Sequence, residues 1–180
     1  MSPAYFYVKD IKNCLPESEA IIATDPYWAF HYARDTIKGR WSEGESVILT
    51  HPEWVFYYAK DIIQGRWPEG EAIITTDPYW SYLYAKDIIK GRWPEGESII
   101  TTDPYWAYYY AKHIIEGHWP EGELTILTDP EWAYYYAKDV IQGRWCQAEN
   151  IIFESVFWEN YVKHFGIELP KKINWLKEGF

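Results

Sequence analysis

The chain has 180 residues, of which 48% are hydrophobic and 20% aromatic, and it carries a formal net charge of −10. This much apolar sequence excludes a disordered chain. The negative charge argues against a general nucleic-acid or anionic-membrane binder, since such proteins present basic surface. No apolar run approaches the roughly 18 residues of a membrane span, and the sequence shows no signal-peptide pattern. We therefore expect a cytoplasmic protein with no membrane contact.

A 26-residue unit repeats along the chain. Residues 65–93 read G-R-W-P-E-G-E-A-I-I-T-T-D-P-Y-W-S-Y-L-Y-A-K-D-I-I-K-G-R-W, and a shift of 26 in either direction returns nearly the same text. One tryptophan recurs every 13 residues, at positions 28, 41, 54, 67, 80, 93, 106, 119, 132, 145 and 158. Repetition at this period indicates an array in which each unit needs its neighbours to bury its apolar face.

We expect a single domain over residues 1–180. It comprises an N-terminal cap helix over 1–15, five repeats over 16–145, and a degenerate repeat with a C-terminal cap over 146–180. Cys14 and Cys146 lie near opposite ends of this array. A disulfide needs Cα atoms within about 7 Å, so we expect both thiols to be reduced.

Each unit is predicted to form a short helix, from P-E-G-E to I-I-T, and a longer one that starts at T-D-P. The aspartates of the second motif are N-cap candidates with proline in the first turn: Asp25, Asp77, Asp103 and Asp129. In the second unit, where His51 replaces the aspartate, Thr50 is the alternative cap, and Ser42 with Glu45 resembles a capping box. A glycine is expected to end each long helix: Gly39, Gly65, Gly91, Gly117 and Gly143.

The pattern of the long helix predicts its packing. At 100° per residue, one side of the helix in the third unit gathers Trp80, Ser81, Leu83 or Tyr84, Ala85, Ile88 and Ile89, and the other gathers Tyr79, Tyr82, Lys86 and Lys90. We predict an all-α fold, an α-solenoid of stacked helix pairs, in which the tryptophans form a continuous buried spine.

The unit A-Y-Y-Y-A-K-D-[IV]-I-x-G-R-W-P-E-[G/A]-E resembles the short tandem helical repeats, often ending R-W-P-E-A-E, of uncharacterised bacteriophage and giant-virus proteins. The resemblance covers roughly residues 5–160. This chain departs from the pattern by having glycine at Gly44, Gly70, Gly96 and Gly122, although Ala148 keeps the alanine. The resemblance implies a viral origin and a place in the cytoplasm of the infected host cell. It supplies no catalytic residues.

A ridge of tyrosines and lysines, which we call the Tyr/Lys ridge, is the candidate binding surface. Its members are Tyr27, Tyr57, Tyr79, Tyr105, Tyr109, Tyr135, Lys60, Lys86, Lys112 and Lys138. Its tyrosine columns vary between units, with Glu53 and Glu131 in one and His31 and Leu83 in the other, while the Trp, Pro and Gly positions stay constant. Variation on a constant scaffold is typical of a binding face, and drift at free surface positions gives the same pattern. The tyrosines can also simply shield the edge of the stack.

We predict a non-enzymatic binding scaffold that occludes or sequesters a host protein through this ridge. One alternative is capture of a nucleotide or a short single-stranded nucleic acid by stacking and phosphate contact. Another is an acidic mimic of nucleic acid, built on the short-helix glutamates, although two glutamates per repeat of roughly 10 Å are much sparser than the charges of duplex DNA. Exposed aromatic residues also make self-association possible.

Charged columns elsewhere indicate structural pairing. One column pairs an aspartate with an arginine in four of the units: Asp35, Asp61, Asp87 and Asp139 with Arg40, Arg66, Arg92 and Arg144. We expect Asp–Arg or Glu–Arg ladders between repeats. In the fourth unit both members of the Asp/Arg column change, to His113 and His118. They form a candidate pH-sensitive site, but no further ligand has the spacing of a metal centre. The sequence shows no catalytic triad or phosphate-cradling loop, so we expect no enzyme, no cofactor and no metal.

Overall fold

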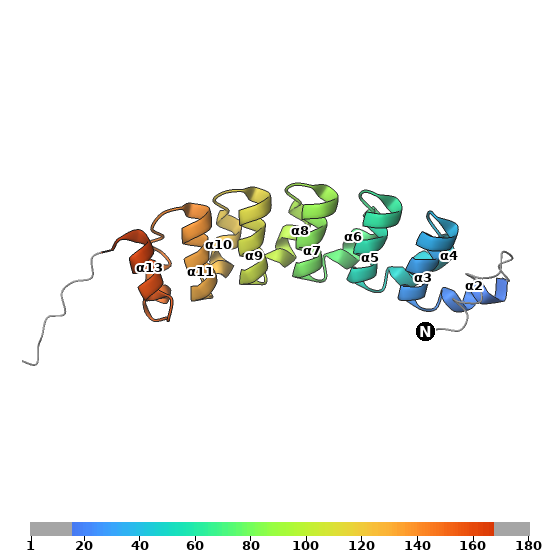
Figure 1. The fold of residues 1–180 in the computed structure, drawn as a ribbon, viewed down its shortest axis with the longest axis horizontal. Helices are drawn as coiled ribbons and strands as arrows, with labels where there is room; N and C mark the ends of the chain where they lie inside the picture. The colour runs from blue at the N-terminus through green and yellow to red at the C-terminus, as the bar shows by residue number, and fades with distance from the viewer. Residues whose placement is uncertain (1–15, 168–180) are drawn as a thin grey trace, which may run out of the picture.

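The computed structural model describes residues 16–167, and every regular element in that range is a helix. The helices lie side by side along one axis in two layers, and together they form a gently curved rod (Figure 1). Each long helix packs against the next short helix and against the long helix of the following repeat. The predicted all-α solenoid with a 26-residue period is confirmed. The cap helix expected over residues 1–15 and the tail from residue 168 lie outside the described residues.

Each repeat contributes one short and one long helix. The short helices are α2 (Pro16–Ile22), α4 (Ser42–Ile48), α6 (Pro68–Ile74), α8 (Pro94–Ile100), α10 (Pro120–Ile126) and α12 (Glu149–Phe153). Each long helix is an α-helical segment that continues as a five-residue π-helical segment: α3 (Pro26–Tyr32) with η1 (Ala33–Ile37), α5 (Pro52–Tyr58) with η2 (Ala59–Ile63), α7 (Pro78–Tyr84) with η3 (Ala85–Ile89), α9 (Pro104–Tyr110) with η4 (Ala111–Ile115), and α11 (Pro130–Tyr136) with η5 (Ala137–Ile141). Helix α13 (Trp158–Phe165) is the last described element.

The long helices end at the predicted positions, but the residue that adopts the left-handed conformation is not the predicted glycine. The left-handed residue is the one before each glycine, as at Lys90 with φ 59°. Both the Lys90 and the Gly91 N–H donate to the carbonyl of Ala85, the latter at 3.2 Å. Because the last turn is a π turn, the residue that closes it, rather than the glycine, adopts the left-handed conformation. The same holds at Lys38, Gln64, Glu116 and Gln142.

The predicted aspartate caps are confirmed. The Asp77 carboxylate accepts the N–H of Trp80 at 3.0 Å, and Asp25, Asp103 and Asp129 cap their helices in the same way. The alternative cap predicted for the second unit, Thr50, was wrong. His51 is the N-cap residue of α5, but its side chain caps no helix N–H and instead contacts the Thr50 hydroxyl at 2.7 Å. The Thr50 hydroxyl also donates to the carbonyl of Val47.

The predicted capping box of Ser42 and Glu45 does not form. Ser42 is already the first residue of α4, and its hydroxyl donates to Glu43. Glu45 instead accepts from Arg40 and from the hydroxyl of Tyr58.

The tryptophans divide into two alternating sets, which corrects the predicted single spine. One set precedes the short helices and is buried: Trp41, Trp67, Trp93, Trp119 and Trp145. The other set lies in the first turn of the long helices and is only half-buried: Trp28, Trp54, Trp80, Trp106, Trp132 and Trp158. The first set fills the space between the layers, and the second covers the edge of the long-helix layer.

Glycine in the short helices makes room for the buried indoles. A Cβ at Gly96 would overlap the ring of Trp93, and Gly44 and Gly122 face their own preceding tryptophans in the same way. Small residues line the other side of the contact, where Ala29, Ala107 and Ala133 are fully buried.

A hydrogen-bonded unit joins successive helices and recurs along the rod. The hydroxyl of Tyr84 accepts the N–H of Trp67 at 2.7 Å and donates to Glu71 at 3.1 Å. Glu71 also accepts two bonds of 2.8 Å from Arg66, which lowers the pKa of the Glu71 carboxyl even though burial opposes the shift. Arg66 reaches Glu95 of the next repeat at 3.7 Å. The predicted arginine ladder therefore uses glutamates rather than aspartates.

The predicted side assignment of Tyr82 was wrong. Tyr82 was placed with the exposed residues, but its side chain is only 4% accessible and stacks against Trp106 of the next repeat at 5.3 Å. Trp80, predicted on the core side, is half-buried instead, and of the two alternatives Leu83 and Tyr84 it is Tyr84 that is buried. A long helix in the middle of the rod contacts two short helices and two long ones, so its buried face is broader than a single amphipathic stripe.

Candidate binding surface

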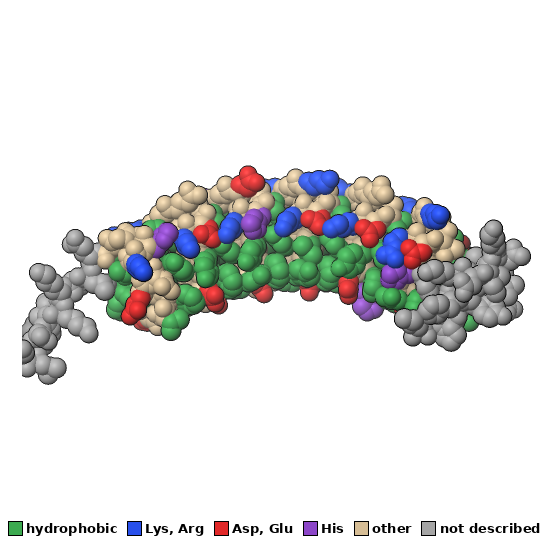
Figure 2. All heavy atoms as spheres, in the orientation of Figure 1, with side chains coloured by type: hydrophobic (Ala, Val, Ile, Leu, Met, Phe, Trp, Pro, Cys, Tyr) green, Lys and Arg blue, Asp and Glu red, His purple; other side chains and the backbone are tan. Residues whose placement is uncertain are grey.

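A continuous apolar band follows the inner curve of the rod on the face of the long helices (Figure 2). We call it the aromatic stripe and define it by its half-buried and exposed members: Tyr27, Trp28, Trp54, Tyr57, Tyr79, Trp80, Leu83, Tyr105, Trp106, Tyr109, Trp132 and Tyr135. All six tyrosines of the predicted Tyr/Lys ridge belong to it. Tyr27 and Tyr79 are its most accessible rings, at 43% and 37%.

Ring contacts connect the stripe from one repeat to the next. Tyr27 meets Trp54 edge-on at 5.5 Å, and Tyr57 meets Trp80 in the same way at 5.9 Å. Further along, Tyr79 packs on Trp106 at 4.9 Å and Tyr105 on Trp132 at 4.7 Å. Four half-buried tryptophans thus lie against a tyrosine of the preceding repeat: Trp54, Trp80, Trp106 and Trp132. This packing fixes the ring positions before any partner arrives, which lowers the entropic cost of binding.

The lysines of the predicted ridge are less free than the sequence suggested. They lie beside the stripe, each over the ring four residues earlier, such as Lys86 over Tyr82 at 5.6 Å. Two of them also bind an aspartate of the next repeat, Lys60 with Asp87 at 2.7 Å and Lys112 with Asp139 at 2.8 Å. We call this line of residues the charged row: Lys60, Lys86, Asp87, Lys112, His113, Lys138 and Asp139. Alternating basic and acidic side chains appear there directly above the stripe (Figure 2).

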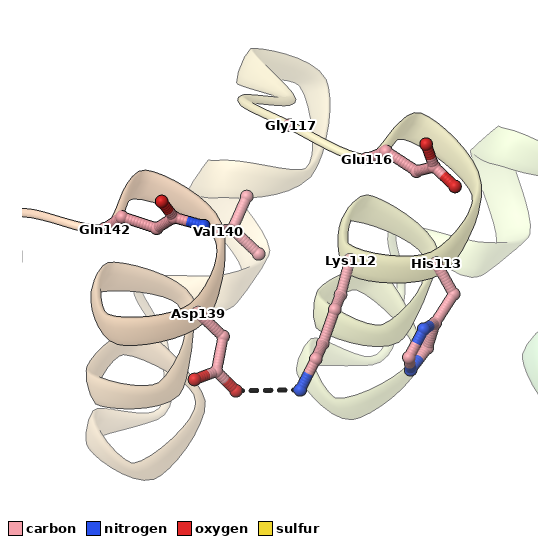
Figure 3. A pocket seen from close by; sticks show the side chains of 7 residues that line it. All are labelled: Lys112, His113, Glu116, Gly117, Asp139, Val140 and Gln142. Atoms are coloured by element: carbon pink, nitrogen blue, oxygen red, sulfur yellow. Dashed lines mark hydrogen bonds and ion pairs between the residues drawn. The ribbon is translucent and has the colours of Figure 1, made fainter.

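The Lys112–Asp139 ion pair links the long helices of the fourth and fifth repeats. Their side chains point toward one another from η4 and η5, whereas His113 points away (Figure 3). The hydroxyl of Tyr108 also donates to Asp139, at 2.6 Å. Burial and this bond to the carboxylate raise the pKa of Tyr108 to about 12. The pKa of Asp139 is lowered despite its burial, because Lys112 and Tyr108 both donate to it.

The charged row is interrupted at His113. This residue occupies the position of Asp87 and Asp139, so Lys86 faces an imidazole where Lys60 and Lys112 face a carboxylate. Burial, together with the charges of Lys112 and Lys86, lowers the pKa of His113. His118 lies apart from His113 and contacts Glu123 at 2.6 Å. No group of three metal-ligating side chains occurs among residues 16–167.

The opposite border of the stripe is acidic. It consists of the cap aspartates and the two glutamates that replace stripe tyrosines: Asp25, Glu53, Asp77, Asp103, Asp129 and Glu131. We call this line the acidic edge, and acidic side chains appear below the apolar band in Figure 2. No ion pair involves any of these six carboxylates in the described part of the chain. The stripe therefore lies between a border of mixed charge and a negative one.

The part that tryptophan plays in this surface was not predicted from the sequence. All tryptophans were expected in the core because they share the 13-residue spacing. The flanking residues contain the missing signal in the regular repeats. The buried set reads R-W-P or an equivalent before a short helix, and the half-buried tryptophans from Trp28 to Trp132 follow D-P or H-P in the first helical turn, whereas Trp158 lacks this motif.

No helix in the described part of the chain is both long and apolar enough to cross a membrane. Cys146 is a free, exposed thiol, and Cys14 lies outside the described residues. Comparisons with family models, with curated proteins and with solved structures gave no match to this chain.

Proposed function

We propose that this chain is a non-enzymatic scaffold that binds a protein partner along the aromatic stripe and occludes or sequesters it. The observation that carries the proposal is the continuity of half-exposed tyrosine and tryptophan rings over successive repeats on one concave face. Tyrosine and tryptophan are enriched at protein interfaces because they offer a large apolar area with little entropy to lose. A contiguous exposed apolar surface of this kind marks an interaction site.

The charge distribution favours a protein over a nucleotide or single strand. Lys60 and Lys112 are neutralised by aspartates, and the acidic edge lies next to the rings where phosphates would have to approach. The acidic-mimic alternative is also disfavoured, because Glu45, Glu71 and Glu97 pair with arginines. The viral resemblance adds the proposal that the partner is a host factor in the cytoplasm.

The combined variant Tyr79→Ala, Tyr109→Ala and Tyr135→Ala tests the proposal. We expect affinity capture from host lysate to lose the specific partner while the helical circular dichroism is retained. The matched control removes three exposed apolar side chains from the short-helix layer, Ile21→Ser, Leu124→Ser and Phe153→Ser. Capture that survives the tyrosine variant, or is lost equally in the control, would overturn the stripe as the binding site.

Salt and size measurements separate the alternatives. Binding through aromatic contacts should persist at 0.5 M NaCl, whereas phosphate binding weakens steeply with ionic strength. Light scattering on the purified chain shows whether the stripe instead binds a second copy. In that case the tyrosine variant, and not the control, should be monomeric.

A further inference from the structure

A hollow of about 340 Å³ lies between α9 and α11 on the aromatic stripe. Tyr108, Tyr109, Trp132 and Tyr135 line it, together with Glu131 and the Lys112–Asp139 pair. The ring centroid of Trp132 lies 5.6 Å from Tyr108, 6.2 Å from Tyr109 and 5.7 Å from Tyr135. Four rings from two repeats thus surround one concave site.

The charges in this hollow leave a negative surplus. Lys112 and Asp139 neutralise each other at 2.8 Å, so Glu131 remains as the uncompensated charge. Glu131 is in the first turn of α11, where its N–H is bound by the cap residue Asp129 at 2.9 Å. No side-chain hydrogen bond or ion pair to Glu131 exists among the described residues. The site therefore combines aromatic faces with an available carboxylate.

The chain itself places cations on rings of this layer in five successive repeats. Arg34 lies over Phe30 at 5.2 Å, Lys60 over Phe56 at 5.2 Å and Lys112 over Tyr108 at 5.3 Å. Lys86 and Lys138 repeat the arrangement. A cation over an aromatic face is attracted by the ring quadrupole. Lys138 also lies 5.9 Å from the Tyr135 ring of the hollow. Among the described residues, no cation lies over the Tyr109 or Trp132 rings, which leaves these two rings to a partner.

We propose that this hollow binds an arginine side chain from a basic segment of the protein partner. The guanidinium plane stacks on the Trp132 and Tyr109 rings and donates hydrogen bonds to the Glu131 carboxylate, a combination for which arginine is better suited than lysine. The inference rests on the proposed function and adds the chemistry of the partner. Net charge supports it, since the chain carries −10 overall and the acidic edge runs along the same border.

A comparison of the repeats at the position of Glu131 explains why we propose the arginine site at this one place in the rod. Tyr27, Tyr79 and Tyr105 occupy the same position in three other repeats and place a ring there instead of a charge. Glu53 takes this position in the second repeat, but Phe30 and His31 stand there in place of the hollow's Tyr108 and Tyr109. Glu131→Tyr therefore restores the common residue of the repeat, keeps the aromatic character and removes the carboxylate. It is a sharper probe than alanine, because a purely apolar contact would be preserved.

Titration with an acetylated (Arg-Gly)₄ peptide in 150 mM NaCl, followed by the indole N–H signal of Trp132 in NMR spectra, tests the proposal. The uncharged control peptide, (citrulline-Gly)₄, has nearly the same shape without the positive charge. We expect the arginine peptide to bind and the citrulline peptide to bind at least tenfold more weakly. Glu131→Gln and Glu131→Tyr should each weaken arginine binding by about tenfold, because each removes the charged acceptor of the guanidinium hydrogen bonds.

Glu159→Gln is the matched control, because it removes one exposed carboxylate from α13, away from the hollow. Equal binding of the two peptides, or equal weakening by Glu131→Gln and Glu159→Gln, would overturn the arginine site. If that happens while capture of the partner still depends on Tyr79, Tyr109 and Tyr135, the proposed function stands and only the partner's chemistry is wrong. If capture does not depend on these tyrosines, the proposed function fails whatever the peptide does.

Discussion

The hydroxyl of Tyr84 accepts the backbone N–H of Trp67 at 2.7 Å across the boundary between two repeats. Trp67 is buried, so its N–H cannot turn to water if the hydroxyl is removed. The same contact joins Tyr58 to Trp41, Tyr110 to Trp93 and Tyr136 to Trp119. A single phenolic oxygen per repeat thus satisfies the backbone at the start of each short helix.

Tyr84→Phe should lower the free energy of unfolding by about 1–3 kcal/mol, because it leaves a buried N–H without an acceptor and takes a donor from Glu71. Urea unfolding followed by circular dichroism measures the loss. Tyr57→Phe is the control, since its half-buried hydroxyl has no hydrogen-bond partner among residues 16–167, and we expect a change within about 0.5 kcal/mol. Equal effects of the two substitutions would contradict the importance of the Tyr84 bond.

Gly96→Ala should destabilise the protein although alanine is the better helix former. The new methyl group would overlap the Trp93 ring, which is buried between the two layers. Overpacking of this kind costs about 1–3 kcal/mol, which outweighs the helix-propensity gain of about 1 kcal/mol. Gly91→Ala, at a position with no atom within 4 Å of the added Cβ, should show no such loss. Unfolding midpoints of the two variants, measured side by side, decide the matter.

The 26-residue period and the all-helical fold were predictable because residues that stay constant between repeats determine them. Pro, Asp and Trp recur at fixed spacing, and the aspartates cap the helices as expected. The burial of Tyr82 was not predictable, because a helical wheel assumes one neighbour and a regular turn. In the structure this helix has neighbours on three sides and ends in the π segment η3. No residue in A-K-D-I-I signals that wider turn by itself.

The candidate binding surface was also predictable only in part. The tyrosine columns were predictable from their variation between units, but the neutralisation of the lysines depends on a contact between residues 27 apart, Lys60 with Asp87. Such a pair can be identified only when the spacing between successive repeats in the structure is known. The acidic edge was likewise hidden, because its cap aspartates were explained by local structure alone.

Deletion of residues 68–93 tests whether the repeat is the folding unit. It joins Trp67 to Pro94 and keeps the text R-W-P-E-G-E at the junction. We expect a folded rod shortened by about 8–10 Å in small-angle scattering, with a lower urea m-value because less surface is exposed on unfolding.

A 13-residue deletion of residues 81–93 is the matched control for the repeat deletion. It keeps a tryptophan before proline but brings Trp80, a stripe residue, to the position of a buried one. We expect this variant to unfold, because the segment that should form a long helix is lost. If it folds as well as the 26-residue deletion, the two tryptophan sets are interchangeable and their distinct positions carry no information.

His113→Asp should strengthen the contact between the third and fourth repeats. It gives Lys86 the carboxylate that Lys60 and Lys112 already have, and such partly exposed pairs contribute about 0.2–1 kcal/mol at pH 7. The gain should shrink at high salt, where the charges are screened. Urea unfolding at 50 mM and 500 mM NaCl measures both effects.

Acid should destabilise the wild type more than the His113→Asp variant. Burial and the charges of Lys112 and Lys86 lower the pKa of His113 below its ordinary value of 6.5. The unfolded state therefore binds a proton at a higher pH than the folded state, so this contribution to stability is complete above pH 6.5 and is lost as pH falls through the lower folded pKa. The stability difference between variant and wild type should be constant near pH 8 and widen between pH 6.5 and 5. Lys86→Gln should reduce this widening without abolishing it, because burial is the larger cause; a difference that stays constant across the range would show that His113 does not titrate with folding.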